Sequence, residues 1–109
     1  MKRFALTLDL KDDPLLIREY EEWHTKVWPE ILDSIHSSGI EKMEIYRMQN
    51  RLFMIMETND SFTFEKKSEM DKSNKKVDEW EDLMWKYQQQ IPGSRPDEKW
   101  ILMDKIFEA

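Results

Sequence analysis

Residues 20–30 decide how the first half of the chain folds, and they read Tyr20-Glu-Glu-Trp-His24-Thr-Lys-Val-Trp28-Pro-Glu30. Side chains four residues apart lie one above the other on a helix, so Tyr20 and His24 share a face. Pro29 disfavours helical geometry at Trp28 and suits the first position of a new helix. The stretch therefore predicts a helix, a break at Trp28 and a second helix, with Tyr20, His24 and Trp28 around one small volume.

The segment before this corner is predicted to be a strand followed by a helix. Residues 3–10 alternate between apolar and polar side chains, which is typical of a strand. Asp13 then offers a helix N-cap, and Pro14 fits the first helical position. The helix buries one apolar stripe, and His24 lies at the edge of that stripe. The stripe consists of Leu16, Tyr20, Trp23 and Val27.

The segment after the corner is predicted to form a helix and a hairpin. The second helix begins at Pro29, and Gly39 is a natural left-handed stop for it. Residues 41–48 alternate as a strand does, and the chain turns at 49–50 into a further strand over 52–56.

The second strand of this hairpin is apolar on both faces. Helices can cover only one side of the sheet, and a chain of this length has no spare layer for the other side. We therefore expect a second copy of the chain to meet the sheet face to face, which makes the protein a homodimer.

The second half of the chain is predicted to end in a helix and a strand. Residues 61–76 are highly charged and indicate a solvated helix or loop rather than a binding patch. A better helix starts near Asn74, and Trp85 points away from the stripe that this helix buries. A loop over 92–96 precedes a last strand over 100–107.

The predicted order is strand, broken helix, strand, strand, helix and strand, without internal repeats or a linker. This order is typical of a ferredoxin-like α+β fold, in which an antiparallel sheet carries helices on one face. We expect residues 1–109 to form a single domain of this kind.

Composition narrows the classes of function. The chain has 109 residues, enough for one core, and the absence of cysteine excludes disulfides and thiolate metal sites and suits a reducing cytoplasm. A formal net charge of −6 works against a nucleic-acid or membrane surface. With only two glycines, no glycine-rich phosphate loop can be written. Neither a signal-peptide core nor a membrane-spanning apolar run is present.

His24 is the candidate acid/base group, because an imidazole titrates near neutral pH and this one lies among aromatic side chains. The competing interpretation is a half-buried histidine bonded to a carbonyl group. Tyr20 and Trp28 are either site residues or packing of the core and the helix corner, and Trp85 is either a site residue or a subunit contact. A metal site is not expected, because no second histidine or clear carboxylate stands at a ligand spacing from His24.

An acid/base histidine with a tyrosine and tryptophan walls, and without a cofactor loop, fits a small neutral ligand. Sugars suit such a pocket because their C–H faces stack on indole rings while their hydroxyl groups form hydrogen bonds. The expected chemistry needs only proton transfer and no cofactor.

Three motifs carry a family resemblance. Tyr20-x-x-x-His24-x-x-x-Trp28-Pro29-Glu30 is followed by Gly39 and by Met84-Trp85-Lys86-Tyr87. Over nearly the whole chain this pattern resembles the L-rhamnose mutarotase family. The resemblance implies a dimeric α+β barrel that exchanges the anomers of 6-deoxy-L-hexoses. It also implies that His24 is the proton donor, that Tyr20 contacts the sugar, and that Met84 and Trp85 line the site.

Two positions depart from the rhamnose enzymes of the family. Met43 stands where they carry a tyrosine at the sugar, and Met84-Trp85 stands where they carry paired tryptophans. The segments 83–88 and 98–103 look more like the L-fucose mutarotases of the same superfamily. We therefore expect L-fucose as the substrate, followed by L-rhamnose. The residues expected to line the sugar pocket are Tyr20, Trp28, Met43, Met84 and Trp85.

The preferred hypothesis is a mutarotase in which His24 opens and closes the sugar ring by acid/base chemistry, with Tyr20 assisting. Two other functions remain open. A non-catalytic dimeric module on the same sheet would bind a small apolar ligand. A dimeric-barrel monooxygenase would handle haem or quinols in an apolar cavity.

Overall fold

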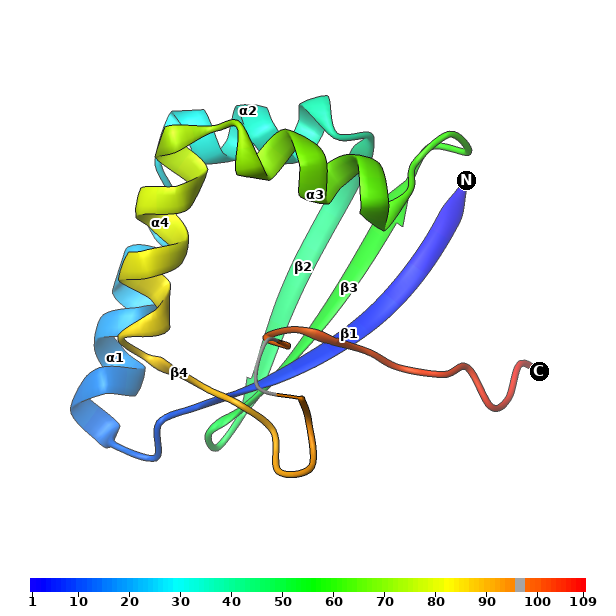
Figure 1. Ribbon diagram of the computed structural model, residues 1–109. Coiled ribbons are helices and arrows are strands. Elements are labelled where there is room, and N and C mark those ends of the chain that lie inside the picture. The colour runs from blue at the N-terminus through cyan, green and yellow to red at the C-terminus, as the bar shows by residue number, and fades with distance from the viewer. Residues whose placement is uncertain (96–97) are drawn as a thin grey trace.

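The computed structural model describes residues 1–95 and 98–109, and within these ranges a first strand is followed by pairs of helices and pairs of strands (Figure 1). The strands are β1 (Lys2–Leu10), β2 (Ile40–Met48), β3 (Arg51–Thr58), β4 (Gln88–Gln89) and β5 (Ile101–Leu102). The helices are α1 (Pro14–Trp23), α2 (Pro29–Ser37), α3 (Phe64–Lys72) and α4 (Lys75–Trp85). None of the helices in the described ranges is long and apolar enough to cross a membrane.

The strands form one antiparallel sheet in the order β2-β3-β1-β4, and β5 also pairs with β1. β3 occupies one edge of β1, while β4 and β5 share the other edge, β4 opposite residues 9–10 and β5 opposite residues 6–7. The first strand thus lies inside the sheet, between the hairpin and the C-terminal strands. This order confirms the predicted ferredoxin-like α+β fold.

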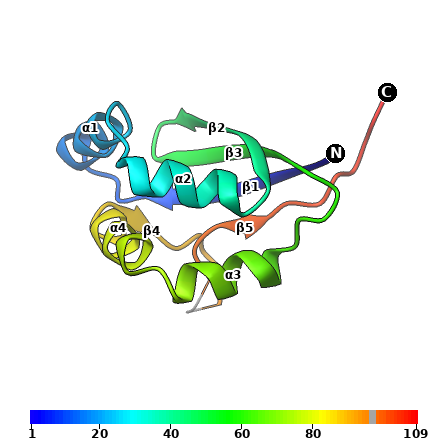
Figure 2. The ribbon, with the colours of Figure 1, turned by 90° about the horizontal axis from the view of Figure 1, so that it is seen from above.

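Helices cover one face of this sheet, which we call the inner face. Seen from above, α1 and α2 form one row, and α4 and α3 form a second row beside it (Figure 2). Strand alternation decides which side chains face them: Leu6 and Leu8 of β1 pair with Met54 and Leu52 of β3, and all four are buried. Together with the helices they form the hydrophobic core.

Several local predictions from the sequence are confirmed. Asp13 caps α1 by accepting two backbone N–H groups at 2.9 and 3.3 Å, and Pro14 is its first residue. The charged segment contains α3, which buries none of its residues and is therefore a solvated helix. Residues 92–95 lie in neither a helix nor a strand, and Pro96 of the predicted loop falls outside the described residues.

The break between the first two helices comes earlier than predicted. Helix α1 ends at Trp23 rather than at Trp28, and His24 is its C-cap. The last turn tightens, since the N–H of His24 donates to the carbonyl group of Glu21 at 3.1 Å, three residues back. Residues 24–28 therefore form a turn that leads into α2.

The predicted last strand over 100–107 is wrong in length. β5 ends at Leu102, and one further hydrogen bond, from the N–H of Met103 to the carbonyl group of Ala5 at 2.8 Å, extends the pairing. Beyond this point the chain runs away from the helices (Figure 1), and the side chain of Ile106 is 94% exposed. Since no apolar surface of the same chain covers this tail, nothing holds it along β1.

The opposite, outer face of the sheet carries apolar side chains that no helix covers. Phe53 and Ile55 of β3 lie there, half-buried. On β2, Tyr46 is opposite Phe53 and Glu44 is opposite Ile55, while Met48 is opposite Arg51; Tyr46 and Met48 are 52% and 75% exposed. The second hairpin strand is therefore apolar on both faces, as its sequence predicts. Contiguous apolar surface of this kind marks an interaction site.

We expect Gly39→Ala to destabilise the fold more than Gly93→Ala. Gly39 has a φ of +101° and Gly93 a φ of +89°, so a side chain at either position strains the backbone by on the order of 1–3 kcal/mol. At Gly39 the new Cβ would also lie 2.9 Å from Oδ1 of Asn59, whereas at Gly93 nothing lies within 4 Å. Urea unfolding measures the loss in free energy of unfolding for each variant. Equal losses would show that the Asn59 side chain moves away from the new Cβ at no cost.

Candidate active site

A cavity of about 430 Å³ lies between the helices and the inner face of the sheet. Tyr20, Trp80 and Met84 contribute buried side chains to its wall, while Leu32 and Glu81 are exposed at its rim. Small-molecule sites commonly have volumes of roughly 300–1,000 Å³. The cavity is therefore large enough for one small ligand and opens to solvent on the helix side.

His24 is fixed at this cavity by the end of helix α1. Because the last turn tightens, the carbonyl oxygen of Tyr20 loses its helical donor, and Nδ1 of His24 lies 2.8 Å from it. A carbonyl oxygen can only accept, so Nδ1 carries the proton and Nε2 of the neutral ring keeps its lone pair. His24 is thus half-buried and bonded to a carbonyl group, as the competing interpretation expects, and it also lines the cavity.

Aromatic rings fix the orientation of the imidazole. The centroids of the His24 and Tyr20 rings are 4.4 Å apart, and the Trp80 ring stands 5.9 Å from His24 at an interplanar angle of 70°. Tyr20 and His24 therefore lie together as predicted, although His24 follows the helix rather than belonging to it.

The phenol of Tyr20 keeps its proton throughout the neutral range. Burial raises the pKa of Tyr20 from 10.0 to about 12, while a hydrogen bond from the Gln88 side chain lowers it and the charge of Glu81 raises it further. At neutral pH the phenol is therefore a hydrogen-bond donor toward the cavity rather than a base.

A hydrogen-bonded chain, which we call the helix latch, ties α1 to the end of α4. Nε1 of Trp23 donates to the hydroxyl oxygen of Tyr87 at 3.1 Å, and this hydroxyl donates to Oε1 of Glu19 at 3.1 Å. The latch therefore connects the C-terminal part of α1, which carries Tyr20, to the segment that directly follows α4.

The tryptophans are placed differently from the prediction. Trp28 does not line the cavity but packs behind Trp80, with ring centroids 5.1 Å apart. Trp85 also lies outside the lining, on the surface, where the ammonium group of Lys99 sits 5.1 Å from its ring. The indole rings that do line the cavity belong to Trp80 and Trp100.

Of the six predicted site residues, the structure brings together Tyr20, His24, Met43 and Met84 around the cavity. The lining residues that sequence reasoning missed include six polar or aromatic side chains: Ser34, His36, Trp80, Glu81, Gln88 and Trp100. Trp80 belongs to the stripe that the α4 pattern predicts to be buried, and burial alone does not separate a core residue from a wall. Gln88 and Trp100 lie in the segments 83–88 and 98–103 that resemble L-fucose mutarotases, but no local pattern marks the remaining residues as part of a wall.

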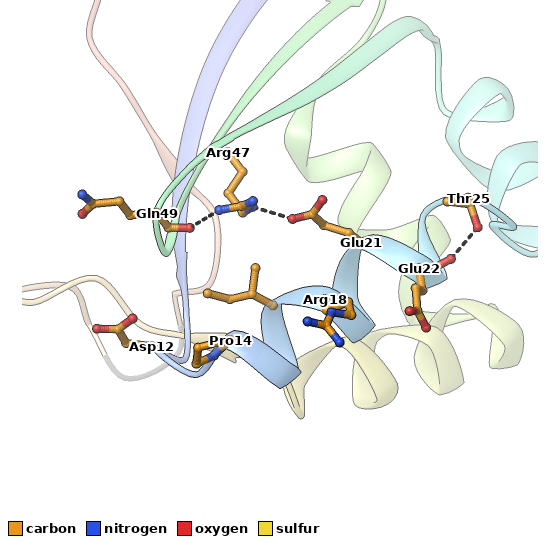
Figure 3. Close-up of a pocket in the computed structure, with 9 residues that line it drawn as sticks. Asp12, Pro14, Arg18, Glu21, Glu22, Thr25, Arg47 and Gln49 are labelled. Carbon is orange, nitrogen blue, oxygen red and sulfur yellow. Dashed lines mark hydrogen bonds and ion pairs between the residues drawn. The ribbon is translucent and has the colours of Figure 1, made fainter.

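A second hollow of about 660 Å³ lies beside α1 (Figure 3). Its polar groups bond one another: Arg47 donates to Oε1 of Glu21 at 2.6 Å and to the carbonyl group of Gln49 at 2.7 Å. This hollow contains no histidine. Across the described residues, no group of three or more His, Cys, Asp or Glu side chains is arranged to hold a metal ion.

Comparisons with known proteins agree on one family. The family model described as L-rhamnose mutarotase matches residues 3–109. An L-fucose mutarotase from Xanthomonas campestris is 40% identical over 109 residues, which cover 98% of this chain and 87% of that protein. An L-rhamnose mutarotase from Paraburkholderia phytofirmans is 30% identical over 86 residues, which cover 77% of this chain and 80% of that protein.

A solved structure extends the comparison to the fold. The crystal structure of an L-rhamnose mutarotase from Formosa agariphila aligns with a TM-score of 0.74 at 22% identity, covering 100% of this chain and 99% of that one. The two proteins share their fold from end to end.

We expect the free energy of unfolding to fall as the pH rises from 10 toward 12. Tyr20 ionises near pH 10 when unfolded but keeps its proton to about pH 12 when folded, so its contribution is complete below 10 and is lost through 12. Tyr20→Phe should flatten this dependence in urea unfolding, with Tyr46→Phe as the control that removes an exposed phenol. The same slope in Tyr20→Phe and wild type would contradict the burial of this phenol.

Proposed function

Because the chain belongs to the L-rhamnose mutarotase family and is a carbohydrate-acting isomerase, we propose that it interconverts the α and β anomers of a 6-deoxy-L-hexose. The family membership sets aside the two alternatives, a non-catalytic binding module and a monooxygenase. The identity of the sugar, the role of His24 and the dimer are the new elements of the proposal.

The proposal rests on one observation. The imidazole of His24, held by a hydrogen bond from Nδ1, lies at the wall of a largely apolar cavity next to the protonated phenol of Tyr20. Mutarotation requires removal of the proton on O1 and protonation of the ring oxygen, after which the open aldehyde rotates and recloses. His24 and Tyr20 are two proton-bearing groups side by side, so they match the two proton transfers.

In the proposed mechanism, Nε2 of His24 accepts the O1 proton while Nδ1 remains bonded to the Tyr20 carbonyl group. The Tyr20 phenol, a donor at neutral pH, gives its proton to the ring oxygen as the C1–O5 bond breaks, and reclosure of the ring reverses both proton transfers. Two further groups of the described lining can exchange a proton: the imidazole of His36, and the carboxylate of Glu81 at the rim, which pairs with Lys99 at 3.2 Å. No covalent intermediate is required.

The walls suit a sugar that has one apolar end. Trp80 and Trp100 offer indole faces for the C–H side of the ring, and Met43 and Met84 offer a flexible apolar surface for the methyl group. Trp28 supports Trp80 from behind rather than touching the ligand. Trp85 has no wall role in this arrangement.

L-fucose is the first candidate substrate, and L-rhamnose is the second. Support comes from the higher identity to the L-fucose mutarotase, 40%, than to the L-rhamnose mutarotase, 30%. In addition, Met43 stands where the rhamnose enzymes carry a tyrosine, and Met84 stands where they carry the first of two tryptophans.

We also propose that the protein is a homodimer formed through the outer face of the sheet. Phe53, Ile55, Tyr46 and Met48 present an uncovered apolar surface there. The C-terminal tail runs away from the helices, and its Ile106 is exposed in the single chain. We propose that this tail contacts the partner subunit. A second copy placed sheet to sheet would cover both.

His24→Ala should lose the acceleration of anomer exchange while keeping the fold. A positioned acid/base group contributes about 10²–10⁴-fold, so the loss should reach this size. Saturation-transfer NMR on L-fucose, L-rhamnose, D-galactose and D-glucose measures exchange above the uncatalysed rate. Lys26→Ala, in the exposed turn that follows His24, is the matched control.

The outcomes separate the two parts of this proposal. If the wild-type protein accelerates exchange of none of the four sugars, the substrate class is wrong. If it accelerates exchange and His24→Ala does so equally, His24 has no part in the reaction.

Ile55→Lys should convert the dimer to a monomer. A charged side chain at the centre of the outer face would have to be buried without a partner, which is strongly unfavourable. Light scattering after size-exclusion chromatography measures the mass, and Leu15→Lys, an equivalent change on the exposed side of α1, is the control. A wild-type monomer, or a dimeric Ile55→Lys variant, would place the contact elsewhere.

A further inference from the structure

Gln88 is a buried polar side chain that the proposed proton transfers do not use. It is the first residue of β4, it is 4% exposed, and it lines the cavity. The other buried polar side chains of the described residues are bonded: Asp9 accepts from Arg51 at 2.8 Å, and Thr58 donates to a carbonyl oxygen at 3.0 Å. Oε1 of Gln88, in contrast, has no hydrogen-bond partner in the protein.

A second unpartnered oxygen helps to show why this one is different. Oδ1 of Asp71 is also buried without a partner, but the other oxygen of its carboxylate pairs with Lys67 at 2.6 Å on the solvated helix α3. Asp71 does not line the cavity. Gln88 alone combines a free buried acceptor with a place in the cavity wall among the residues that the structure describes.

The protein fixes the position of this amide closely. The backbone of Gln88 pairs with Leu10 in the sheet, and the adjacent carbonyl group of Tyr87 accepts from the N–H of Lys11 at 2.8 Å. The side chain also lies near the Tyr20 phenol, whose pKa it lowers. The only acceptor of a glutamine amide is its Oε1, so any donor that reaches Gln88 must bond this atom.

Leaving such an acceptor empty is unfavourable. A buried carbonyl oxygen that has lost water and gained no donor destabilises the folded protein, and native proteins keep few of them. An apolar side chain of similar length would fill the same space without this penalty. Gln88 lines the cavity, so a small turn of its amide would let a bound ligand supply the missing donor.

We propose that Oε1 of Gln88 accepts a hydrogen bond from a non-anomeric ring hydroxyl of the bound sugar and thereby selects its substrate. This inference rests on the proposed function, and it adds a specificity-determining residue to it. The ligand must carry a hydroxyl donor on its ring, which separates a sugar from an apolar molecule of the same size. The amide does not titrate, so Gln88 acts in binding rather than in proton transfer.

The location of Gln88 supports a role in selecting the substrate rather than in transferring a proton. Tyr20 stands between His24 and Gln88. Its ring lies against the His24 ring, and its phenol lies near the Gln88 side chain. A sugar whose anomeric centre lies at His24 therefore presents another part of its ring to Gln88. A site built to bond a hydroxyl group discriminates strongly against an analogue that lacks it, because the polar group is then left unpaired.

The first test replaces the amide by an apolar chain of similar length. Gln88→Met should raise KM for the preferred sugar roughly 5- to 100-fold, with a smaller change in kcat and an unchanged pH profile. Its urea midpoint without sugar should equal or exceed that of the wild type. Gln89→Met, the exposed neighbour on the same strand, is the matched control.

The second test needs no variant. Monodeoxy analogues of L-fucose, each lacking one non-anomeric ring hydroxyl, are compared as substrates of the wild-type protein, with every rate divided by its uncatalysed rate. One analogue should bind much more weakly than the others. For Gln88→Met, the same analogue and the parent sugar should bind alike.

The outcomes distinguish this inference from the function on which it rests. If the wild type exchanges no sugar, the proposed function fails before any variant is compared. If the wild type is active but Gln88→Met keeps its KM, or all monodeoxy analogues lose affinity equally, Gln88 does not read a hydroxyl group. A loss confined to kcat with a shifted pH profile would also overturn the proposal.

Discussion

The way helix α1 ends is the constraint on which the site depends. One tightened turn moves the N–H of His24 from the Tyr20 carbonyl group to that of Glu21. The oxygen left over needs a donor, and the nearest side chain able to supply one is the imidazole of the same residue. A single backbone adjustment thus sets the tautomer of His24, its ring orientation and its position above Tyr20.

Most of the fold could be predicted because its signals are local and periodic. Alternation in β1 and β2, the Asp13 cap and the stop at Gly39 each specify one element, and their order leaves few topologies. The end of α1 could not be predicted in this way. The apolar spacing typical of a helix continues through Val27. That α1 nevertheless ends at Trp23 depends on the geometry of one turn and not on a sequence pattern.

The site was predictable only in part, for the same reason. Tyr20 and His24 are coupled by helical spacing, so the sequence places them together. The five tryptophans, in contrast, look alike in sequence, and only packing assigns Trp80 to the wall and Trp28 to the layer behind it. Gln88 follows a helix end, and its burial at the cavity wall results from packing, which no local pattern encodes.

The helix latch has a consequence for how ligands come and go. Trp23, Tyr87 and Glu19 clasp the two helix ends on one side of the cavity, so that side cannot widen without breaking two hydrogen bonds. Leu32 and Glu81 are exposed at the rim of the cavity, where Glu81 pairs with Lys99 at 3.2 Å. A ligand that enters past Leu32 would therefore leave both hydrogen bonds of the helix latch intact.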